Sequence, residues 1–95
     1  MVERKIYLSP AFGRKLKRLQ TQEKQKLDAA ILTILDDPTI GQEKVGDLAG
    51  VLVHKFKINK QLTLLSYNYT DSEINLLTLG SHENFYRDLK RYKKT

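Results

Sequence analysis

The chain has 95 residues, and its 17 Lys and Arg residues outnumber its 11 Asp and Glu residues, so its formal net charge is +6 and its pI is near 9.6. This length predicts one domain, residues 1–95, with a single modest core. Because cysteine is absent, disulfides, thiolate zinc sites and a thiol nucleophile are excluded. The N-terminus lacks the apolar core of a signal peptide and no apolar run approaches the ~20 residues of a membrane span, so we expect a soluble cytoplasmic protein without membrane contact. The positive charge favours an anionic partner: RNA, DNA, anionic lipid or an acidic protein.

The N-terminal half is predicted to contain a short strand and two helices. Residues Lys5 to Ser9 alternate in polarity and stop at Pro10, which predicts a strand and then a helix capped by Ser9. A new helix start is indicated at Thr21 to Lys24, and Asp36 to Pro38 ends that helix. The two helices are expected to form a hairpin that buries its apolar stripes against an apolar surface formed later in the chain. The first helix is also basic, through Arg14, Lys15, Lys17 and Arg18.

The C-terminal half is predicted to be an antiparallel meander followed by a helix. Gly41 to Gly50 is a connection with a short extended piece near Val45 to Leu48. Three runs rich in β-branched residues, leucine and tyrosine are separated by turn-like pieces: Val51 to Ile58, Leu62 to Tyr69 and Ile74 to Leu79. After Gly80 the pattern becomes helical again. The order βααβββα predicts an α+β domain with the helical hairpin on one face of the sheet.

Two lysines in the first strand of the meander are candidates for holding a phosphate. Strand alternation sends Lys55 and Lys57 to one face and His54, Phe56 and Ile58 to the other. Two ammonium groups on neighbouring rungs concentrate positive charge on a stiff element, which suits transition-state stabilisation. The alternative is an ordinary solvated sheet face. For His54, its apolar neighbours favour a packed, hydrogen-bonded histidine over a catalytic base.

A second candidate is His82, at the point where the last strand is expected to give way to a helix. Tyr86 follows at helical i, i+4 spacing, so it could offer an aromatic surface for a base beside a proton donor. Positive charge continues through Arg87, Lys90 and Arg91. The alternative is that His82 caps the helix and the aromatic residues belong to the core. Two histidines without a paired carboxylate motif make a poor ligand set, so we expect neither a metal nor a cofactor.

With these motifs the chain resembles the RelE/ParE superfamily of bacterial type II toxin–antitoxin toxins over nearly its whole length. The resemblance includes Gly46 to Gly50 leading into the sheet, and the step from Leu77 to His82. Lys55-Phe56-Lys57 resembles the lysine pair of RelE-type messenger RNA interferases. Gly80 to Tyr86 is similar to the ending of YafQ-type interferases, where a histidine and an aromatic residue serve catalysis and base stacking.

The resemblance implies metal-independent cleavage of mRNA on the ribosome. A 2′-hydroxyl attacks the adjacent phosphate, the 5′-oxygen leaves, and a 2′,3′-cyclic phosphate remains. It makes His82 the general acid, Lys55 and Lys57 the support for phosphate charge with one of them a candidate base, and Tyr86 the stacking platform. The basic residues of the first helix would touch ribosomal RNA. A cognate antitoxin protein is the implied partner.

Two alternatives arise from the same resemblance. Many interferases carry an arginine on the third strand of the sheet, where this chain has Gln61 to Thr63. That guanidinium is either missing here or supplied from elsewhere, with Arg87 as the candidate. Members of the ParE branch share the fold, lack the catalytic set and inhibit DNA gyrase. A nuclease acting on DNA or on free RNA would use the same basic face.

Overall fold

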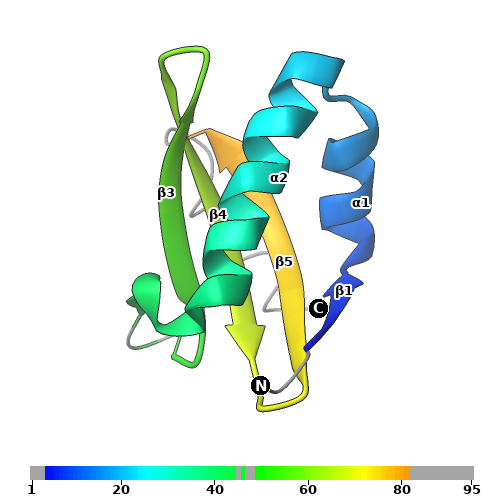
Figure 1. The fold of residues 1–95 in the computed structure, drawn as a ribbon. Helices are drawn as coiled ribbons and strands as arrows, with labels where there is room; N and C mark the ends of the chain where they lie inside the picture. The colour runs from blue at the N-terminus through cyan, green and yellow to red at the C-terminus, as the bar shows by residue number, and fades with distance from the viewer. Residues whose placement is uncertain (1–3, 45, 47–48, 82–95) are drawn as a thin grey trace.

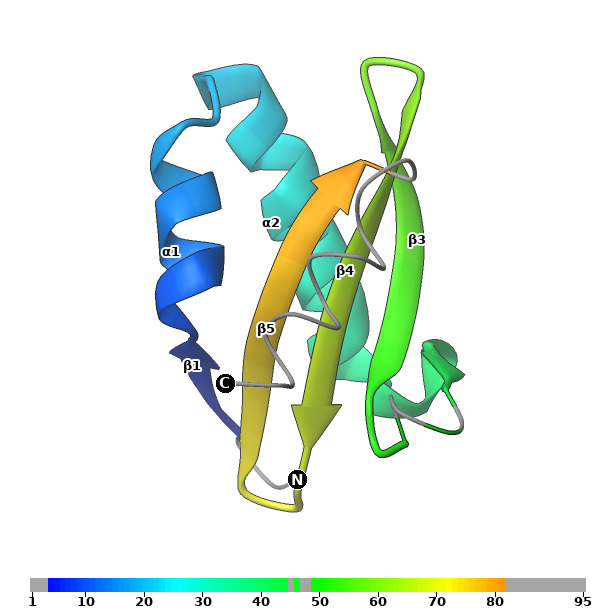
Figure 2. The same cartoon turned by 180° about the vertical axis from the view of Figure 1, so that it is seen from behind.

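The computed structural model describes residues 4–44, 46 and 49–81. The strands form one sheet in the order β1-β5-β4-β3-β2, and the two α-helices cover one face of it (Figures 1 and 2). The predicted α+β class, with a helical hairpin on a meander, is confirmed; the predicted C-terminal helix lies outside the described residues. In chain order the elements are β1 (Lys5–Leu8), α1 (Pro10–Lys17), α2 (Thr21–Asp36), the 3₁₀ helix η1 (Pro38–Ile40), β2 (Gln42–Glu43), β3 (Leu52–Ile58), β4 (Gln61–Tyr69) and β5 (Glu73–Ser81).

The first strand joins the sheet beside the last described one. β1 runs parallel to β5, with Lys5 opposite Glu73 and Leu8 opposite Leu76. A parallel neighbour requires a crossover connection, and here the chain between β1 and β5 contains the helical hairpin and the strands β2 to β4. β1 is therefore an edge strand, and its four residues are exposed.

Local capping explains where the two helices begin. The Ser9 hydroxyl accepts a hydrogen bond from the Phe12 backbone N–H at 3.0 Å, and Pro10 occupies the first helical position, as predicted. The second helix begins at Thr21, where the Glu23 carboxylate accepts a hydrogen bond from the Gln20 backbone N–H at 2.9 Å. In the part of the chain that the structure describes, neither α-helix has the length and apolar character that crossing a membrane requires.

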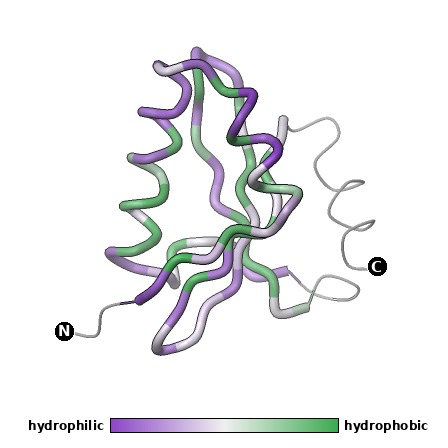
Figure 3. Tube along the Cα trace, turned by 90° about the vertical axis from the view of Figure 1, so that its right-hand side faces the viewer, coloured by the Kyte–Doolittle hydropathy of each residue, from purple (hydrophilic) through white to green (hydrophobic). Residues whose placement is uncertain are grey.

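The core lies between the helices and the sheet. Hydropathy alternates along the helices, as expected when each buries one side (Figure 3). Side chains from α1 and α2 meet the inner faces of β4 and β5, and the fully or almost fully buried members are Phe12, Leu27, Ile34, Leu65, Tyr67, Ile74, Leu76 and Leu79. Burial of these apolar groups is the main force that holds the hairpin on the sheet.

Tyr67 ties the connection after α2 to the core. Its hydroxyl donates to the Pro38 carbonyl at 2.6 Å and accepts from the Gly41 N–H at 3.0 Å. The next strand is β2, which pairs Gln42 with Val53 and Glu43 with Leu52. This two-residue strand precedes the extended piece expected near Val45 to Leu48, of which residues 45, 47 and 48 lie outside the described part of the chain.

The last strand is longer than predicted. We expected it to end at Leu79, but β5 continues through Gly80 and Ser81, because Gly80 pairs with Leu64 and Ser81 with Thr63. A register shift at Ser66/Tyr67 leaves one extra residue in β5, a β-bulge that turns successive side chains. β5 thus includes Ser81, the residue directly before His82.

Candidate functional site

The lysine pair lies on the sheet face opposite α1 and α2, because the alternate residues Leu52 and Phe56 pack against the core beneath these helices. In β3, Lys55 pairs with Leu64 and Lys57 with Leu62, whereas the intervening Phe56 pairs with Thr63. Both lysines are exposed. Residues two apart on a strand are separated by about 7 Å along its axis. The two ammonium groups can therefore contact the same phosphate or two consecutive phosphates.

The pairing also relates this face to the end of β5. Lys55 lies opposite Leu64, and Leu64 lies opposite Gly80. Two strand spacings separate the backbones of Lys55 and Gly80, which is roughly 10 Å. Gly80 lies two residues before His82 in the sequence. The roles assigned to Lys55 and Lys57 remain predictions.

The second group of sequence candidates follows Ser81, the last described residue. These residues lie outside the described part of the chain: His82, Tyr86, Arg87, Lys90 and Arg91. Their assignment as general acid, stacking platform and phosphate contacts remains a prediction.

His54 faces the helix side and not the lysine side. It is half-buried, and its ring stacks on that of Phe56 with centroids 5.9 Å apart. Burial lowers the pKa of His54 below its usual value, because desolvation penalises the charged ring. The imidazole is therefore neutral near pH 7 and packs as an aromatic group. Its ring points away from the lysine face.

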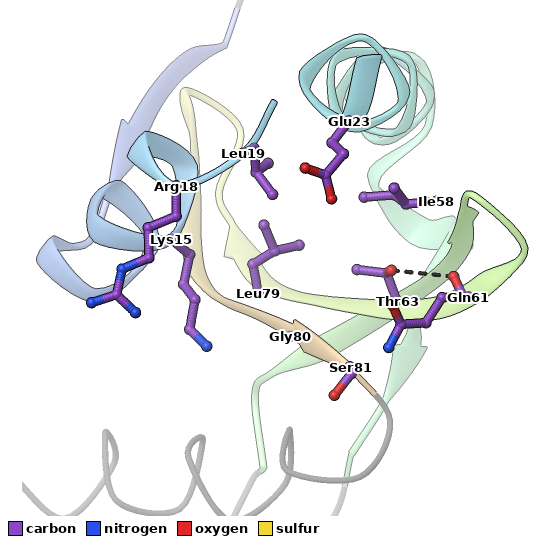
Figure 4. Close-up of a pocket in the computed structure, with 10 residues that line it drawn as sticks. All are labelled: Lys15, Arg18, Leu19, Glu23, Ile58, Gln61, Thr63, Leu79, Gly80 and Ser81. Carbon is purple, nitrogen blue, oxygen red and sulfur yellow. Dashed lines mark hydrogen bonds between the residues drawn. The ribbon is translucent and has the colours of Figure 1, made fainter. Parts of the chain in front are cut away.

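The three basic residues of α1 and Arg18, which caps its C-terminal end, are exposed, and two of the four belong to a pocket. Lys15 and Arg18 line this pocket, whereas Arg14 and Lys17 do not. The pocket, of about 180 Å³, lies between the α1–α2 turn and the ends of β3, β4 and β5 (Figure 4). Its other lining residues are Leu19, Glu23, Ile58, Gln61, Thr63, Leu79, Gly80 and Ser81.

Sequence reasoning did not find this pocket. Gln61 and Thr63 stood out only as the place where an arginine was expected, and Glu23 only as part of a helix start. The pocket forms because strand pairing brings Thr63 beside Ser81 and because the helical hairpin turns above them. Among the described residues, no group of three or more His, Asp or Glu side chains could hold a metal ion.

The comparisons with known proteins assign the fold and the family. Residues 6–90 match the model of the family described as ParE-like toxin of type II bacterial toxin–antitoxin system. The chain belongs to this family. It is therefore the toxin of a type II toxin–antitoxin system, and the resemblance stated from the sequence is confirmed. No curated protein sequence matches the chain.

Solved structures of ParE-like and RelE-like toxins share the fold. An arginine double mutant of E. coli RelE in the free state has a TM-score of 0.72 at 14% identity, covering 98% of both chains. The intact E. coli RelBE toxin–antitoxin complex gives 0.67 at 15% identity, covering 84% of this chain and 98% of that chain. YafQ from E. coli gives 0.58 at 19% identity, covering 83% of this chain and 93% of that chain. At these identities the likeness shows the fold alone.

Proposed function

We propose that this ParE-like toxin is a ribosome-dependent, metal-independent endoribonuclease that cleaves mRNA and inhibits translation. The observation that carries the proposal is the pair of exposed lysines, Lys55 and Lys57, on one face of the inner strand β3. Both lysines lie on a regular strand whose backbone pairs with β4, with Lys55 opposite Leu64 and Lys57 opposite Leu62. Such a rigid cationic site suits the stabilisation of charge that develops on a phosphate.

The proposed reaction is an internal transfer at one phosphodiester. The 2′-oxygen loses its proton to a base and bonds to phosphorus, the bond from phosphorus to the 5′-oxygen breaks, and the general acid His82 gives its proton to that leaving oxygen. Lys55 and Lys57 stabilise the charge on the non-bridging oxygens, and one of them is the candidate base. Tyr86 stacks on a neighbouring nucleotide. The products are a 2′,3′-cyclic phosphate and a free 5′-hydroxyl.

Basic side chains outside this centre would hold the RNA partners. In α1, Arg14 and Lys17 are exposed and available to ribosomal RNA phosphates, and Arg87, Lys90 and Arg91 extend the charge in the proposed assignment. Phosphate contacts of this type make binding fall steeply with salt. A net charge of +6 agrees with a polyanionic partner.

A cognate antitoxin is the proposed protein partner. Several structures with the same fold are toxin–antitoxin complexes, among them RelBE of E. coli. In this chain the edge strand β1 exposes Ile6, Tyr7 and Leu8 by 41%, 49% and 47%. An edge strand with free backbone groups and exposed apolar side chains is a suitable surface for an antitoxin segment to cover.

Inhibition of DNA gyrase is the second candidate function. The family model is that of ParE-like toxins, and β4 carries no arginine. In this case the chain would act by binding a protein and would not need His82. It predicts accumulation of cleaved DNA, an SOS response and inhibited supercoiling.

The proposals are separated by mapping transcript ends after brief expression of the toxin. Ribosome-dependent cleavage predicts new ends in phase with codons in translated regions, and their disappearance in His82→Ala. Cuts in untranslated RNA would indicate a nuclease acting on free RNA. Growth inhibition without new transcript ends, retained by His82→Ala, would refute the nuclease and favour inhibition of gyrase.

A further inference from the structure

The pocket between the α1–α2 turn and the sheet has one acidic group inside it. Figure 4 shows the Glu23 carboxylate pointing from α2 into the space between Leu19 and Ile58, above Leu79. Glu23 is half-buried. One of its oxygens accepts the Gln20 N–H at 2.9 Å. A carboxylate has about four acceptor positions, so the remaining ones are available to a ligand that brings hydrogen-bond donors.

The walls of the pocket suit a flat ring. Leu19, Ile58 and Leu79 provide apolar surfaces on three sides, and the buried Thr63 completes the floor. The volume is about 180 Å³. A cavity of roughly 150 Å³ holds one benzene molecule, so this open pocket has the size for one planar base and not for two.

The rim of the pocket has the opposite charge from its interior. Lys15 and Arg18 line one side, and Figure 4 shows their charged ends directed outward from the centre. Cations at the rim disfavour a lysine or arginine side chain of a protein partner as the occupant. They favour a ligand with donor groups at its inner edge and a phosphate at its outer end. A nucleotide has this polarity.

The carboxylate selects among the bases. Guanine presents two adjacent donors, N1–H and the N2 amino group, on its Watson–Crick edge, and the two oxygens of a carboxylate can accept both. Adenine and cytosine each present a single amino group beside an acceptor nitrogen, which a carboxylate oxygen repels, and uracil presents one N–H between two carbonyl oxygens. We propose that this pocket is a guanine-binding subsite, with Glu23 reading the base edge and Lys15 and Arg18 holding the phosphate. The inference rests on the proposed action on RNA and adds a base preference to it.

The test uses the purified full chain and the four ribonucleoside 5′-monophosphates, titrated by NMR at low salt. Guanosine monophosphate is expected to shift the methyl signals of Thr63 and Leu79 and to bind about tenfold or more tightly than the other three, the range of discrimination of a good bidentate contact. Equal binding of all four nucleotides, or binding of N-acetyl-arginine amide in place of guanosine monophosphate, would overturn the proposal.

A matched pair of variants tests whether the Glu23 carboxylate recognises the guanine edge. Glu23→Gln keeps an oxygen to accept the Gln20 N–H, since glutamine also serves at this capping position, but it replaces the second acceptor with an amino group. We expect it to abolish the guanine preference, while Asp28→Asn, an equal loss of charge at an exposed site on α2, retains it. Lys15→Ala is expected to weaken all four nucleotides alike. A guanine preference that survives Glu23→Gln would refute the assignment.

Failure of the guanine subsite can be distinguished from failure of the proposed nuclease activity. If the chain cleaves mRNA but binds all four nucleotides equally, the guanine subsite is refuted and the proposed nuclease activity is retained. A chain that binds guanosine monophosphate selectively but makes no transcript ends supports the subsite and refutes the nuclease.

Discussion

Removing one oxygen atom from the core, in Tyr67→Phe, tests how the connection after α2 is held. Tyr67 is 0% exposed, and its hydroxyl bridges the Pro38 carbonyl and the Gly41 N–H at 2.6 and 3.0 Å. The substitution keeps the ring and its packing, and it removes both hydrogen bonds. Pro38 is buried, so its carbonyl would lose its partner where water has little access.

The magnitude can be worked out from these two bonds. Each contributes about 0.5–1.5 kcal/mol, and an unsatisfied buried acceptor costs about 1–3 kcal/mol. We therefore expect the free energy of unfolding to fall by about 2–4 kcal/mol. For a domain of this size each 1 kcal/mol lowers Tm by about 4–8 °C, which predicts a loss of roughly 10–25 °C.

Urea denaturation followed by circular dichroism measures the effect. The midpoint should shift while the slope m stays unchanged. Tyr7→Phe is the control, because Tyr7 is 49% exposed and its hydroxyl can be replaced by water. A loss below about 0.5 kcal/mol for Tyr67→Phe, equal to that of the control, would refute the bridging role.

The remaining predictions concern close packing and pH. Gly41→Ala should destabilise the chain by about 1–3 kcal/mol, because an added Cβ would lie 2.5 Å from the Tyr67 hydroxyl oxygen. In the Tyr67→Phe background the same substitution should destabilise the chain less. Equal losses of stability in both backgrounds would contradict this steric reason. Burial lowers the pKa of His54, so the unfolded chain binds the proton more tightly, and stability should fall as pH falls from about 6.5 through the lower folded-state pKa. His54→Phe should make the free energy of unfolding less dependent on pH in this range. An unchanged slope would refute the role of His54 in the pH dependence. Burial raises the pKa of Tyr67, so wild-type stability should also fall as pH rises above about 10, and Tyr67→Phe should lose that dependence.

Local signals in the sequence were sufficient for some features of the fold. Ser9 before Pro10 marks the start of α1 because capping depends on adjacent residues. The alternation around Lys55 and Lys57 correctly separates them from His54, because a strand has a period of two. The family and the α+β architecture could be predicted from such patterns taken together.

Features that depend on distant pairing were missed. The parallel pairing of Ile6 with Ile74 leaves no trace in either segment. Gly80 and Ser81 extend β5 only because Leu64 and Thr63 lie opposite them, and glycine by itself indicates the end of a strand. The pocket around Glu23 joins residues of two helices and three strands, so its position depends on packing that no single segment encodes.

The measurement that tests the central claim most directly is cleavage of a defined mRNA on purified, programmed ribosomes. Wild-type toxin should cut the codon in the decoding site and leave a 2′,3′-cyclic phosphate, and no cut should form without ribosomes. The Lys55→Ala/Lys57→Ala double variant should lose this activity, whereas Lys24→Ala/Lys26→Ala, which removes the same charge from exposed positions on α2, should retain it. Full cleavage by the Lys55→Ala/Lys57→Ala variant, or no cleavage by folded wild-type toxin, would contradict the account.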